Sequence, residues 1–513
     1  MNTAALNTTL SKNARWVALA LFVITIITRI PFASQYLYHW DSVNMAFGIR
    51  EFNVLEGAPQ FPGYIVYIVI AQLVNFVFND PQTTMLVISI ISSGLAVAVI
   101  FYLGRDLFNP TSGLIAALFL LTSPLFWFYG EIALPHTLDL LAVTYAAWLL
   151  YRIMQGEHGL LWWTVIFLAL LGGFRQQDLL FMGPLLLFCC YRVGLRKLIL
   201  AALLGAAVTL AWFIPLISFA GGLQNYLSGS SAFTQEFFTT TSLLSGAGLF
   251  GLRRNVLEKL LPYTAYAWSL AALGILGWLP ALRGWRAGLR DRRLWFFVLW
   301  MAPTIGFYVI IHMGQQGLVF VFLPALLLLS AEGLYRLLNS RPMLLRAAAV
   351  IIALISAGVF LLAPSHPLGK DRLKLLTYAT LREADQLMGD KIAAVRENFQ
   401  PENTLLLAAN WRHLQYYLPE YRFARFNIGA KFEVEAGQPT SADFVGQPTS
   451  AEVAGLTGGQ EWQIVVMDEE LREFAAQPLQ EVERANGFRL AYLPLAADAL
   501  YFTDGTTFGA QES

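Results

Sequence analysis

Four polar segments interrupt long apolar stretches of this sequence, and each brings acidic, basic or amide side chains close to Gly or Pro. They contain His39-Trp40-Asp41-Ser42, Gly130-Glu131 with Pro135-His136, Phe174-Arg175-Gln176, and His312-Met313-Gly314-Gln315-Gln316. A carboxylate in such a segment can accept the proton of an acceptor hydroxyl as a general base. Arginine and histidine can stabilise a phosphate that leaves. These residue types together favour group transfer from a phosphate-linked donor.

Each of these residues also has a purely structural explanation. Asp41 suits a helix N-cap, Glu131 a solvated loop acid, and Arg175 a side chain that extends to lipid headgroups. The remaining three positions are explained by a helix start, a partner on a neighbouring span and an interfacial position: His136, Asp139 and His312. The evidence for chemistry is their coincidence on one face of a membrane, in the topology that the basic residues indicate.

The composition indicates a membrane protein. Of 513 residues, 57% are hydrophobic and only 13% are charged, whereas soluble globular proteins carry roughly 25% charged residues. This composition excludes a soluble enzyme, a disordered chain and a nucleic-acid-binding protein. Cys189 and Cys190 are adjacent in an apolar run, a spacing that predicts neither a disulfide nor a zinc site.

About eleven apolar runs are long enough to predict membrane spans, each of which needs ~20 residues. They are 14–32, 83–104, 111–128, 136–152, 159–175, 177–191, 197–219, 260–282, 294–312, 317–338 and 344–363. Lys12 and Arg15 place the N-terminus in the cytoplasm. The later arginine clusters are all cytoplasmic only if a further apolar stretch, 62–79, is a juxtamembrane helix on the outer surface. The alternative, a twelfth span at 62–79, puts most of these clusters outside.

The charge is divided unevenly along the chain. Residues 364–513 hold 21 acidic and 13 basic residues, out of 34 of each in the whole sequence. We therefore predict two domains, a membrane domain at 1–363 and an extracytoplasmic α/β domain at 364–513. In the second domain the pattern predicts strands at 403–408 and 462–467, helices at 373–398 and 411–418, and a closing hairpin at 488–503. A near-duplicate at 437–454 predicts a flexible loop.

The order of these features resembles the GT-C superfamily of polyprenyl-phosphate-dependent membrane glycosyltransferases, in its protein O-mannosyltransferase and aminoarabinose transferase branch. The resemblance covers about residues 14–340. It depends on the following motifs: Asp41-Ser42 in the first outer loop, Pro62-Gly63-Tyr64, Leu103-Gly104-Arg105-Asp106-Leu107-Phe108, Ser123-Pro124, and Trp127…Glu131…Pro135. Gln60-Phe61 stands where similar bacterial members have His-Pro.

The resemblance implies a GT-C-like α-helical polytopic membrane protein and assigns roles to residues. Asp41 is the expected catalytic base, and Glu131 the expected second acidic group, with His136 or Asp139 as alternatives for it. From their positions at the outer ends of predicted spans, we expect Arg175 and His312 to hold the donor phosphate. Substrate binding is assigned to His39, Tyr64, His136, Arg175, Gln176, His312 and Gln316. A divalent cation, Mg²⁺ or Mn²⁺, is a further expectation, with Asp41 and Glu131 as its ligands.

The function expected is an inverting-type transfer of a sugar from a polyprenyl phosphate to an extracytoplasmic protein, lipid or glycan, at the plasma membrane. Two other classes remain open at this stage. A flippase or polymerase of lipid-linked oligosaccharides also has many spans and outward arginines, but needs neither paired outer acids nor a soluble tail. A transporter would show inverted repeats and acids near mid-membrane, whereas the acids here lie at span ends.

Overall fold

The structure is a computed structural model that describes residues 3–368, 373–425, 427–428, 442–443, 463–468, 472, 475–494, 500–501 and 507–508. It divides into two compact units. The first contains Met1–Ser34, Asn44–Pro367 and Lys374–Leu381, and the second contains Gln35–Val43, Leu368–Leu373 and Arg382–Ser513. The second unit thus includes a short segment of the first loop, Gln35–Val43, which a division at residue 364 assigns to the membrane domain.

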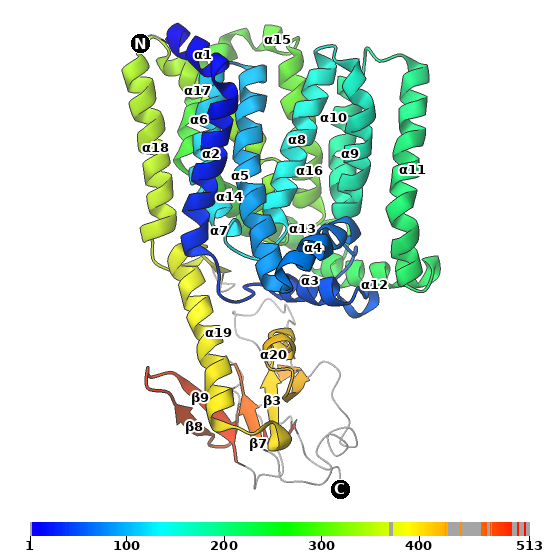
Figure 1. Cartoon of the computed structure of the whole chain (residues 1–513), viewed down its shortest axis with the longest axis vertical. Helices are drawn as coiled ribbons and strands as arrows, with labels where there is room; N and C mark the ends of the chain where they lie inside the picture. The colour runs from blue at the N-terminus through cyan, green and yellow to red at the C-terminus, as the bar shows by residue number, and fades with distance from the viewer. Residues whose placement is uncertain are drawn as a thin grey trace. The chain divides into compact units, whose positions relative to one another are not determined.

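The first unit is a bundle of helices that run side by side (Figure 1). Within the residues that the structure describes, seven helical segments are long and apolar enough to cross a membrane: Ala14–Phe32, Pro81–Leu107, His136–Met154, Leu195–Phe219, Gly248–Ala281, Arg292–Ile310 and Pro342–Leu362. The other predicted runs form shorter helices.

The helices of the first unit have the following bounds: α1 (Thr3–Lys12), α2 (Ala14–Arg29), α5 (Pro81–Leu107), α6 (Pro110–Thr122), α7 (Pro124–Tyr129), α8 (His136–Met154), α9 (Leu161–Phe174), α10 (Gln176–Cys189), α11 (Leu195–Phe219), α12 (Leu223–Thr241), α13 (Gly248–Arg253), η4 (Arg254–Leu260), α14 (Leu261–Trp268), η5 (Ser269–Gly284), α15 (Trp285–Gly288), α16 (Arg292–Ile310), η6 (Gln316–Val321), α17 (Leu323–Leu338) and α18 (Pro342–Leu362).

Local sequence explains why some runs are broken. The run predicted at 111–128 is interrupted because Ser123 precedes Pro124 and takes an extended ψ of 122°, as residues before proline prefer. The run therefore forms α6 and α7. Cys189 and Cys190 are both buried free cysteines, as their adjacent positions predict.

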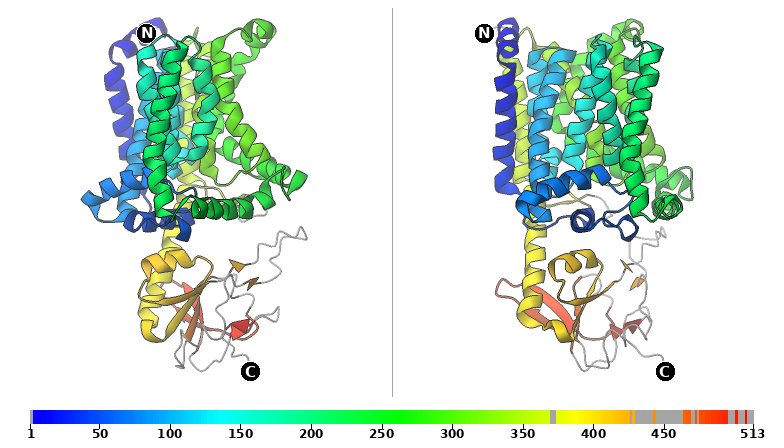
Figure 2. Two further views of the ribbon diagram at one scale, coloured as in Figure 1. Left: turned by 90° about the vertical axis from the view of Figure 1, so that its right-hand side faces the viewer. Right: turned by 45° about the vertical axis from the view of Figure 1, so that its right-hand side comes forward.

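The stretch at 62–79 forms α4 (Ile65–Phe78), a helix of 14 residues. It lies across the ends of the helices it packs against, α5 and α9, rather than along them (Figures 1 and 2). This is the arrangement expected of a juxtamembrane helix.

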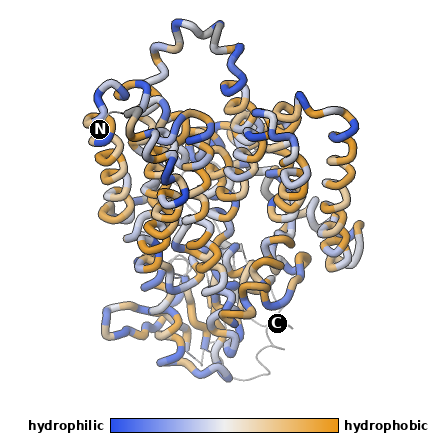
Figure 3. Tube along the Cα trace, turned by 45° about the horizontal axis from the view of Figure 1, so that its top comes forward, coloured by the Kyte–Doolittle hydropathy of each residue, from blue (hydrophilic) through white to orange (hydrophobic). Residues whose placement is uncertain are grey.

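Small residues allow the helices of the bundle to approach closely. A Cβ on Gly104 of α5 would lie 2.7 Å from the Cα of Gly113 in α6, and Gly277 of η5 meets the backbone of Gly333 in α17 in the same way. Such contacts between small residues are typical of helices packed within a membrane. Apolar residues cover most of the helices that are long and apolar enough to cross a membrane, and polar residues gather at the connecting loops (Figure 3).

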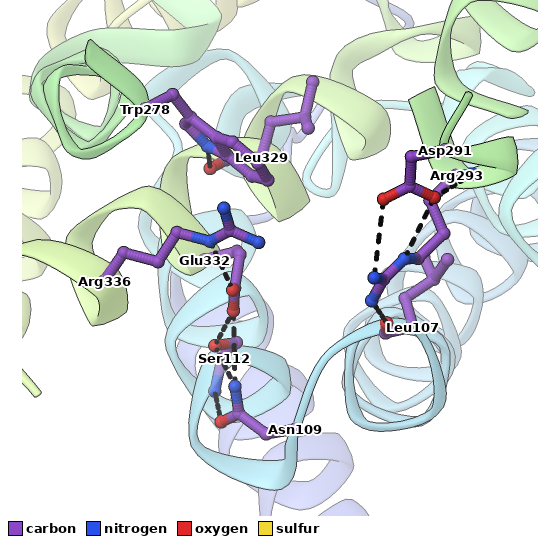
Figure 4. A network of polar contacts seen from close by, with 9 residues as sticks. All are labelled: Leu107, Asn109, Ser112, Trp278, Asp291, Arg293, Leu329, Glu332 and Arg336. Atoms are coloured by element: carbon purple, nitrogen blue, oxygen red, sulfur yellow. Dashed lines mark hydrogen bonds and ion pairs between the residues drawn. The ribbon is translucent and has the colours of Figure 1, made fainter. Parts of the chain in front are cut away.

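A polar network joins helices where the predicted cytoplasmic arginines lie (Figure 4). Glu332 of α17 accepts hydrogen bonds from Asn109, Ser112 and Arg336, the last over 2.7 Å. The guanidinium of Arg336 also lies 3.8 Å from the ring centre of Trp278. Arg336 is therefore a structural residue as well as a basic end of a span.

The second unit contains a five-stranded sheet in the order β4-β3-β7-β9-β8. Its strands are β3 (Thr404–Ala408), β4 (Arg422–Arg425), β7 (Gln463–Val466), β8 (Gln480–Glu483) and β9 (Arg489–Leu493), and its helices are α19 (Tyr378–Asn398) and α20 (Trp411–Tyr417). β3 is parallel to β4 and β7, while β9 is antiparallel to β7 and β8. Every residue of β3 is buried, because apolar clusters pack on both faces of the sheet.

The predicted strands at 403–408 and 462–467 and the predicted helix at 411–418 are confirmed within one or two residues. The predicted hairpin at 488–503 is wrong. β9 pairs instead with the preceding strand β8, and the two-residue β10 (Leu500–Tyr501) pairs with β11 (Thr507–Phe508). The turn between β8 and β9 carries Asn486-Gly487, with Gly487 at φ 83°, a dipeptide that strongly favours hairpins. Apart from Ala442–Asp443, the near-duplicate at 437–454 lies outside the described residues.

Candidate active site

Asp41 lies in the second unit, in the first turn of α3 (Trp40–Arg50), where the helix dipole favours a negative charge. Its backbone N–H donates to Nδ1 of His39 over 3.0 Å, and one oxygen of its carboxylate lies 3.8 Å from the same nitrogen. Because Nδ1 accepts a hydrogen bond, the neutral imidazole carries its proton on Nε2. The side chain of Asp41 is 24% exposed, so a substrate hydroxyl can reach it.

A cavity of about 410 Å³ lies within the second unit, beside this segment. Its wall includes residues that follow the parallel strands, Asn410 after β3 and Asp468 after β7. Ligands of open α/β sheets commonly bind at this carboxyl edge. The polar lining also includes His39, Asp385, Lys391 and His413, and Lys391 forms an ion pair with Asp468 over 3.2 Å.

Glu131 lies in the first unit and is fully buried, so the structure does not support its alternative as a solvated loop acid. Its charge acts on Arg29, which is also fully buried. Arg29 donates to the carbonyl of Leu121 over 2.7 Å, and its guanidinium lies 4.3 Å from the ring centre of Trp127. The structure therefore places Glu131 opposite a fixed cation.

Arg175 joins α9 to α10 and faces two buried carboxylates. Its Nη1 donates to Oδ2 of Asp139 over 2.6 Å, and the side chain of Asp139 is fully buried. Asp178, in the first turn of α10, is also fully buried and acts electrostatically on Arg175, as do Tyr308 and Tyr64. Arg175 is thus a buried ion-pair partner. The structure does not support the alternative that its side chain extends to the outer headgroups.

His136 begins α8 and contacts the turn that leads into η6. Its Nε2 hydrogen-bonds Oε1 of Gln315 over 2.9 Å, and its ring packs edge-on against Tyr129. Tyr129 in turn accepts a hydrogen bond from the backbone N–H of Gly317. Gln316 is buried and donates to the carbonyl of Lys374 over 3.5 Å.

Gln176 and Tyr64 flank the turn that contains Pro62. Gln176 donates to the hydroxyl of Tyr226 over 2.9 Å, and Tyr226 donates to the carbonyl of Pro62 over 3.2 Å. Tyr64 caps α4 with a left-handed φ of 44°. This chain of hydrogen bonds fixes the Pro62-Gly63-Tyr64 motif to α10 and α12.

His312 lies just after α16, where two basic residues act on it. Its Nδ1 hydrogen-bonds the hydroxyl of Thr241 over 3.0 Å. The charges of Lys259 and Arg254, both in η4, act on its ring. Three nitrogen-bearing side chains therefore gather here, a composition that suits an anionic group.

The predicted site residues fall into separate sets of partners. His39 and Asp41 share the second unit, while the other predicted residues belong to the first unit, with Glu131 against Arg29, Arg175 against Asp139, and His136 against Gln315. Within the described part of the chain, no three side chains of His, Cys, Asp or Glu form a group that could hold a metal ion.

Sequence reasoning did not assign roles to Arg29, Asp178 and Tyr308. A signal for the first two was present, because an ionisable residue at the end of a long apolar run is costly and usually paired or functional. Tyr308 carried no such signal, since a tyrosine inside an apolar run resembles an ordinary packed aromatic residue.

Comparison with known proteins identifies the architecture. Residues 62–219 match the family model described as dolichyl-phosphate-mannose-protein mannosyltransferase. The crystal structure of ArnT from Cupriavidus metallidurans in the apo state is 15% identical, with a TM-score of 0.54 over 96% of this chain and 99% of that one. The structure of the same protein bound to undecaprenyl phosphate is 14% identical, with a TM-score of 0.52 over 96% and 98%. No relative among curated protein sequences matches this chain.

The solved structures establish a shared fold, and the family match covers the segment that runs from the Pro62-Gly63-Tyr64 motif to the end of α11. Together they show that this chain has the fold of ArnT and that residues 62–219 are similar to the dolichyl-phosphate-mannose-protein mannosyltransferase family.

Proposed function

We propose that this protein transfers a sugar from a polyprenyl-phosphate-linked donor to a nucleophilic group of an extracytoplasmic protein, lipid or glycan, with Asp41 as the general base. The observation that carries the proposal is the position of Asp41, a partly exposed carboxylate at a helix start beside His39 and next to a cavity. The undecaprenyl phosphate bound by ArnT supports a polyprenyl phosphate as the carrier of the donor sugar.

In the proposed reaction Asp41 accepts the proton of the acceptor hydroxyl as its oxygen attacks the anomeric carbon of the sugar. A new bond between that oxygen and the anomeric carbon forms. The bond between the anomeric carbon and the phosphate oxygen breaks, and its electron pair leaves with the polyprenyl phosphate. Attack opposite the leaving group inverts the anomeric configuration.

Basic residues of the first unit suit the leaving phosphate. The charges of Lys259 and Arg254 act on His312, and Arg175 offers a guanidinium whose planar donors match phosphate oxygens. We assign donor-phosphate binding to Arg175 and His312, and substrate contacts to His39, Tyr64, His136, Gln176 and Gln316. The binding of Mg²⁺ or Mn²⁺ by Asp41 and Glu131 stays a prediction, and no step of this scheme is assigned to it.

The test is the transfer activity of the purified Asp41→Asn variant with synthetic undecaprenyl-phosphate-linked sugars. Loss of a general base lowers the rate by about 10²–10⁴-fold, and we expect the variant to keep its melting temperature. Glu51→Gln is the matched control, because Glu51 is an exposed acid ten residues along the chain. Full activity of Asp41→Asn would remove the base assignment, and a product with retained configuration would remove the inverting mechanism.

A further inference from the structure

The segment that carries the proposed base takes its shape from the C-terminal domain. Residues 33–39 adopt no helix or strand, and Gln35–Val43 belong to the same compact unit as Arg382–Ser513. A segment without regular structure satisfies its backbone groups through other parts of the protein. Here those partners are side chains about 350 to 380 residues away in the sequence.

Asp385 of α19 grips two successive amides of this segment. Its Oδ2 accepts the backbone N–H of Gln35 over 3.0 Å, and its Oδ1 accepts that of Tyr36 over 3.1 Å. Asp385 is 5% exposed. Burial raises the pKa of its carboxyl, and the two backbone hydrogen bonds oppose that shift. A buried carboxylate that receives two N–H groups fixes both the position and the direction of the backbone.

α20 holds the next residue at both its amide and its carbonyl. The hydroxyl of Tyr417 accepts the N–H of Leu37 over 2.7 Å, and Nε2 of His413 donates to the carbonyl of Leu37 over 3.0 Å. Two aromatic contacts also pack this segment against α20, and one of them involves Trp40, next to the proposed base. Tyr36 packs edge-on against Tyr417, and Trp40 packs edge-on against Trp411 with ring centres 5.3 Å apart.

We propose that the C-terminal domain contributes to the active site by positioning the general base. Asp385, His413 and Tyr417 are positioning residues that hold segment 35–40 and thereby fix the orientation of the Asp41 carboxylate. The proposal rests on the assignment of Asp41 as the base. The last gripped residue, Trp40, is adjacent to Asp41 in the chain, so a shift of the segment moves the carboxylate directly. A misplacement of about 1 Å costs on the order of 10²-fold in rate.

α19 offers a matched pair of variants. Asp385 and Asp390 are both buried acids of this helix, but Asp390 accepts hydrogen bonds from Arg484 and Asn486 rather than from the segment. We expect Asp385→Asn to lower kcat by about 10–10²-fold with little change in the KM for the lipid-linked donor. Asp390→Asn should keep kcat within about twofold of the wild type. Hydrogen exchange of the amides of residues 35–37 should accelerate in Asp385→Asn only.

Side chains of α20 provide an independent arm. Gln at position 413 can present a donor where His413 presents Nε2, whereas Leu cannot, so His413→Gln should keep kcat and His413→Leu should lower it. Tyr417→Phe removes only the oxygen that accepts from Leu37 and should also lower kcat. This arm decides the matter if Asp385→Asn fails to fold.

The outcomes separate the two proposals. If Asp41→Asn is inactive while Asp385→Asn and Tyr417→Phe behave like Asp390→Asn, the positioning role is overturned and the base assignment stands. If Asp41→Asn keeps full transfer activity, the base assignment falls, and the positioning role that rests on it falls too. Unchanged hydrogen exchange of the amides of residues 35–37 in Asp385→Asn would show that Asp385 does not hold this segment, whatever the activity of Asp41→Asn.

Discussion

The guanidinium of Arg175 donates to the carboxylate of Asp139 over 2.6 Å, and the side chains of both residues are almost completely buried. A second buried carboxylate, Asp178, acts on the same cation. Taking charges out of water is costly, so each member of such a set depends on the others for compensation. Arg175, Asp139 and Asp178 therefore have a structural role. For Arg175, the proposed binding of the donor phosphate would be a second role.

Arg175→Ala leaves two buried carboxylates without their cation. Breaking a buried ion pair costs about 3–5 kcal/mol, so we expect a clear fall in the melting temperature of the detergent-purified protein. If Arg175 also binds the donor phosphate, the KM for the lipid-linked donor rises more than the KM for the acceptor. Asp139→Asn is the control for the structural part, since it breaks the pair but keeps the arginine. Equal donor KM values in the two variants would contradict the phosphate role.

Glu131 and Arg29 should be coupled in stability. The carboxylate and the guanidinium are both fully buried and act on one another, so either single change strands a charge. We expect Glu131→Gln and Arg29→Met to be non-additive by about 0.5–3 kcal/mol in a double-mutant cycle, measured by thermal unfolding. The double variant then tests catalysis, because it no longer strands a charge. If its kcat equals that of Arg29→Met, Glu131 is structural and not a second catalytic acid.

His413 should make the second unit less stable in mild acid. Burial lowers its pKa to about 4, from an ordinary value of 6.5; His39 and Lys391 act in the same direction, while the hydrogen bond to the Leu37 carbonyl and the charge of Asp468 oppose them. Between pH 6.5 and 4 the unfolded chain binds a proton that the folded chain does not, so stability falls as the pH falls. The loss amounts to on the order of 3 kcal/mol by pH 4, and it is absent above pH 6.5, where both states are neutral.

The measurement is hydrogen exchange of the β3 amides between pH 4.5 and 8, corrected for intrinsic exchange rates. The wild type should lose protection on acidification, and His413→Gln, which does not titrate, should lose less. Asp385 changes the stability in the opposite direction. Because burial raises its pKa, the folded state binds a proton before the unfolded state does as the pH falls, and this group stabilises the folded state on acidification. Identical pH profiles for the wild type and His413→Gln would show that His413 does not carry this dependence.

Sequence patterns predicted the elements of this protein better than their pairing. Apolar runs predict helices because a membrane span must satisfy its own backbone and present apolar side chains, and β3 was recognisable because it is buried on both faces. The partner of Glu131 was not predicted, since Arg29 is 102 residues away and the helix packing that joins them leaves no local pattern. The hydrogen bond from Gln35 to Asp385 was not predicted for the same reason, because the two residues are 350 positions apart. The hairpin error was local and avoidable, because Asn486-Gly487 marked the true turn.

The proposed orientation makes a final prediction, which places the second unit outside the cytoplasm and the loop between α15 and α16 inside. Ala485 lies exposed in the turn between β8 and β9, and Arg290 lies exposed in that loop. A membrane-impermeant maleimide should label Ala485→Cys in intact cells and should label Arg290→Cys only after the membrane is opened. The native cysteines are both buried, so their background labelling should be low. The reverse pattern would place Asp41 and its segment in the cytoplasm, because Gln35–Val43 belong to the same unit as Ala485. The base would then face the side of the membrane opposite to the proposed acceptor, and transfer to an extracytoplasmic acceptor would be excluded.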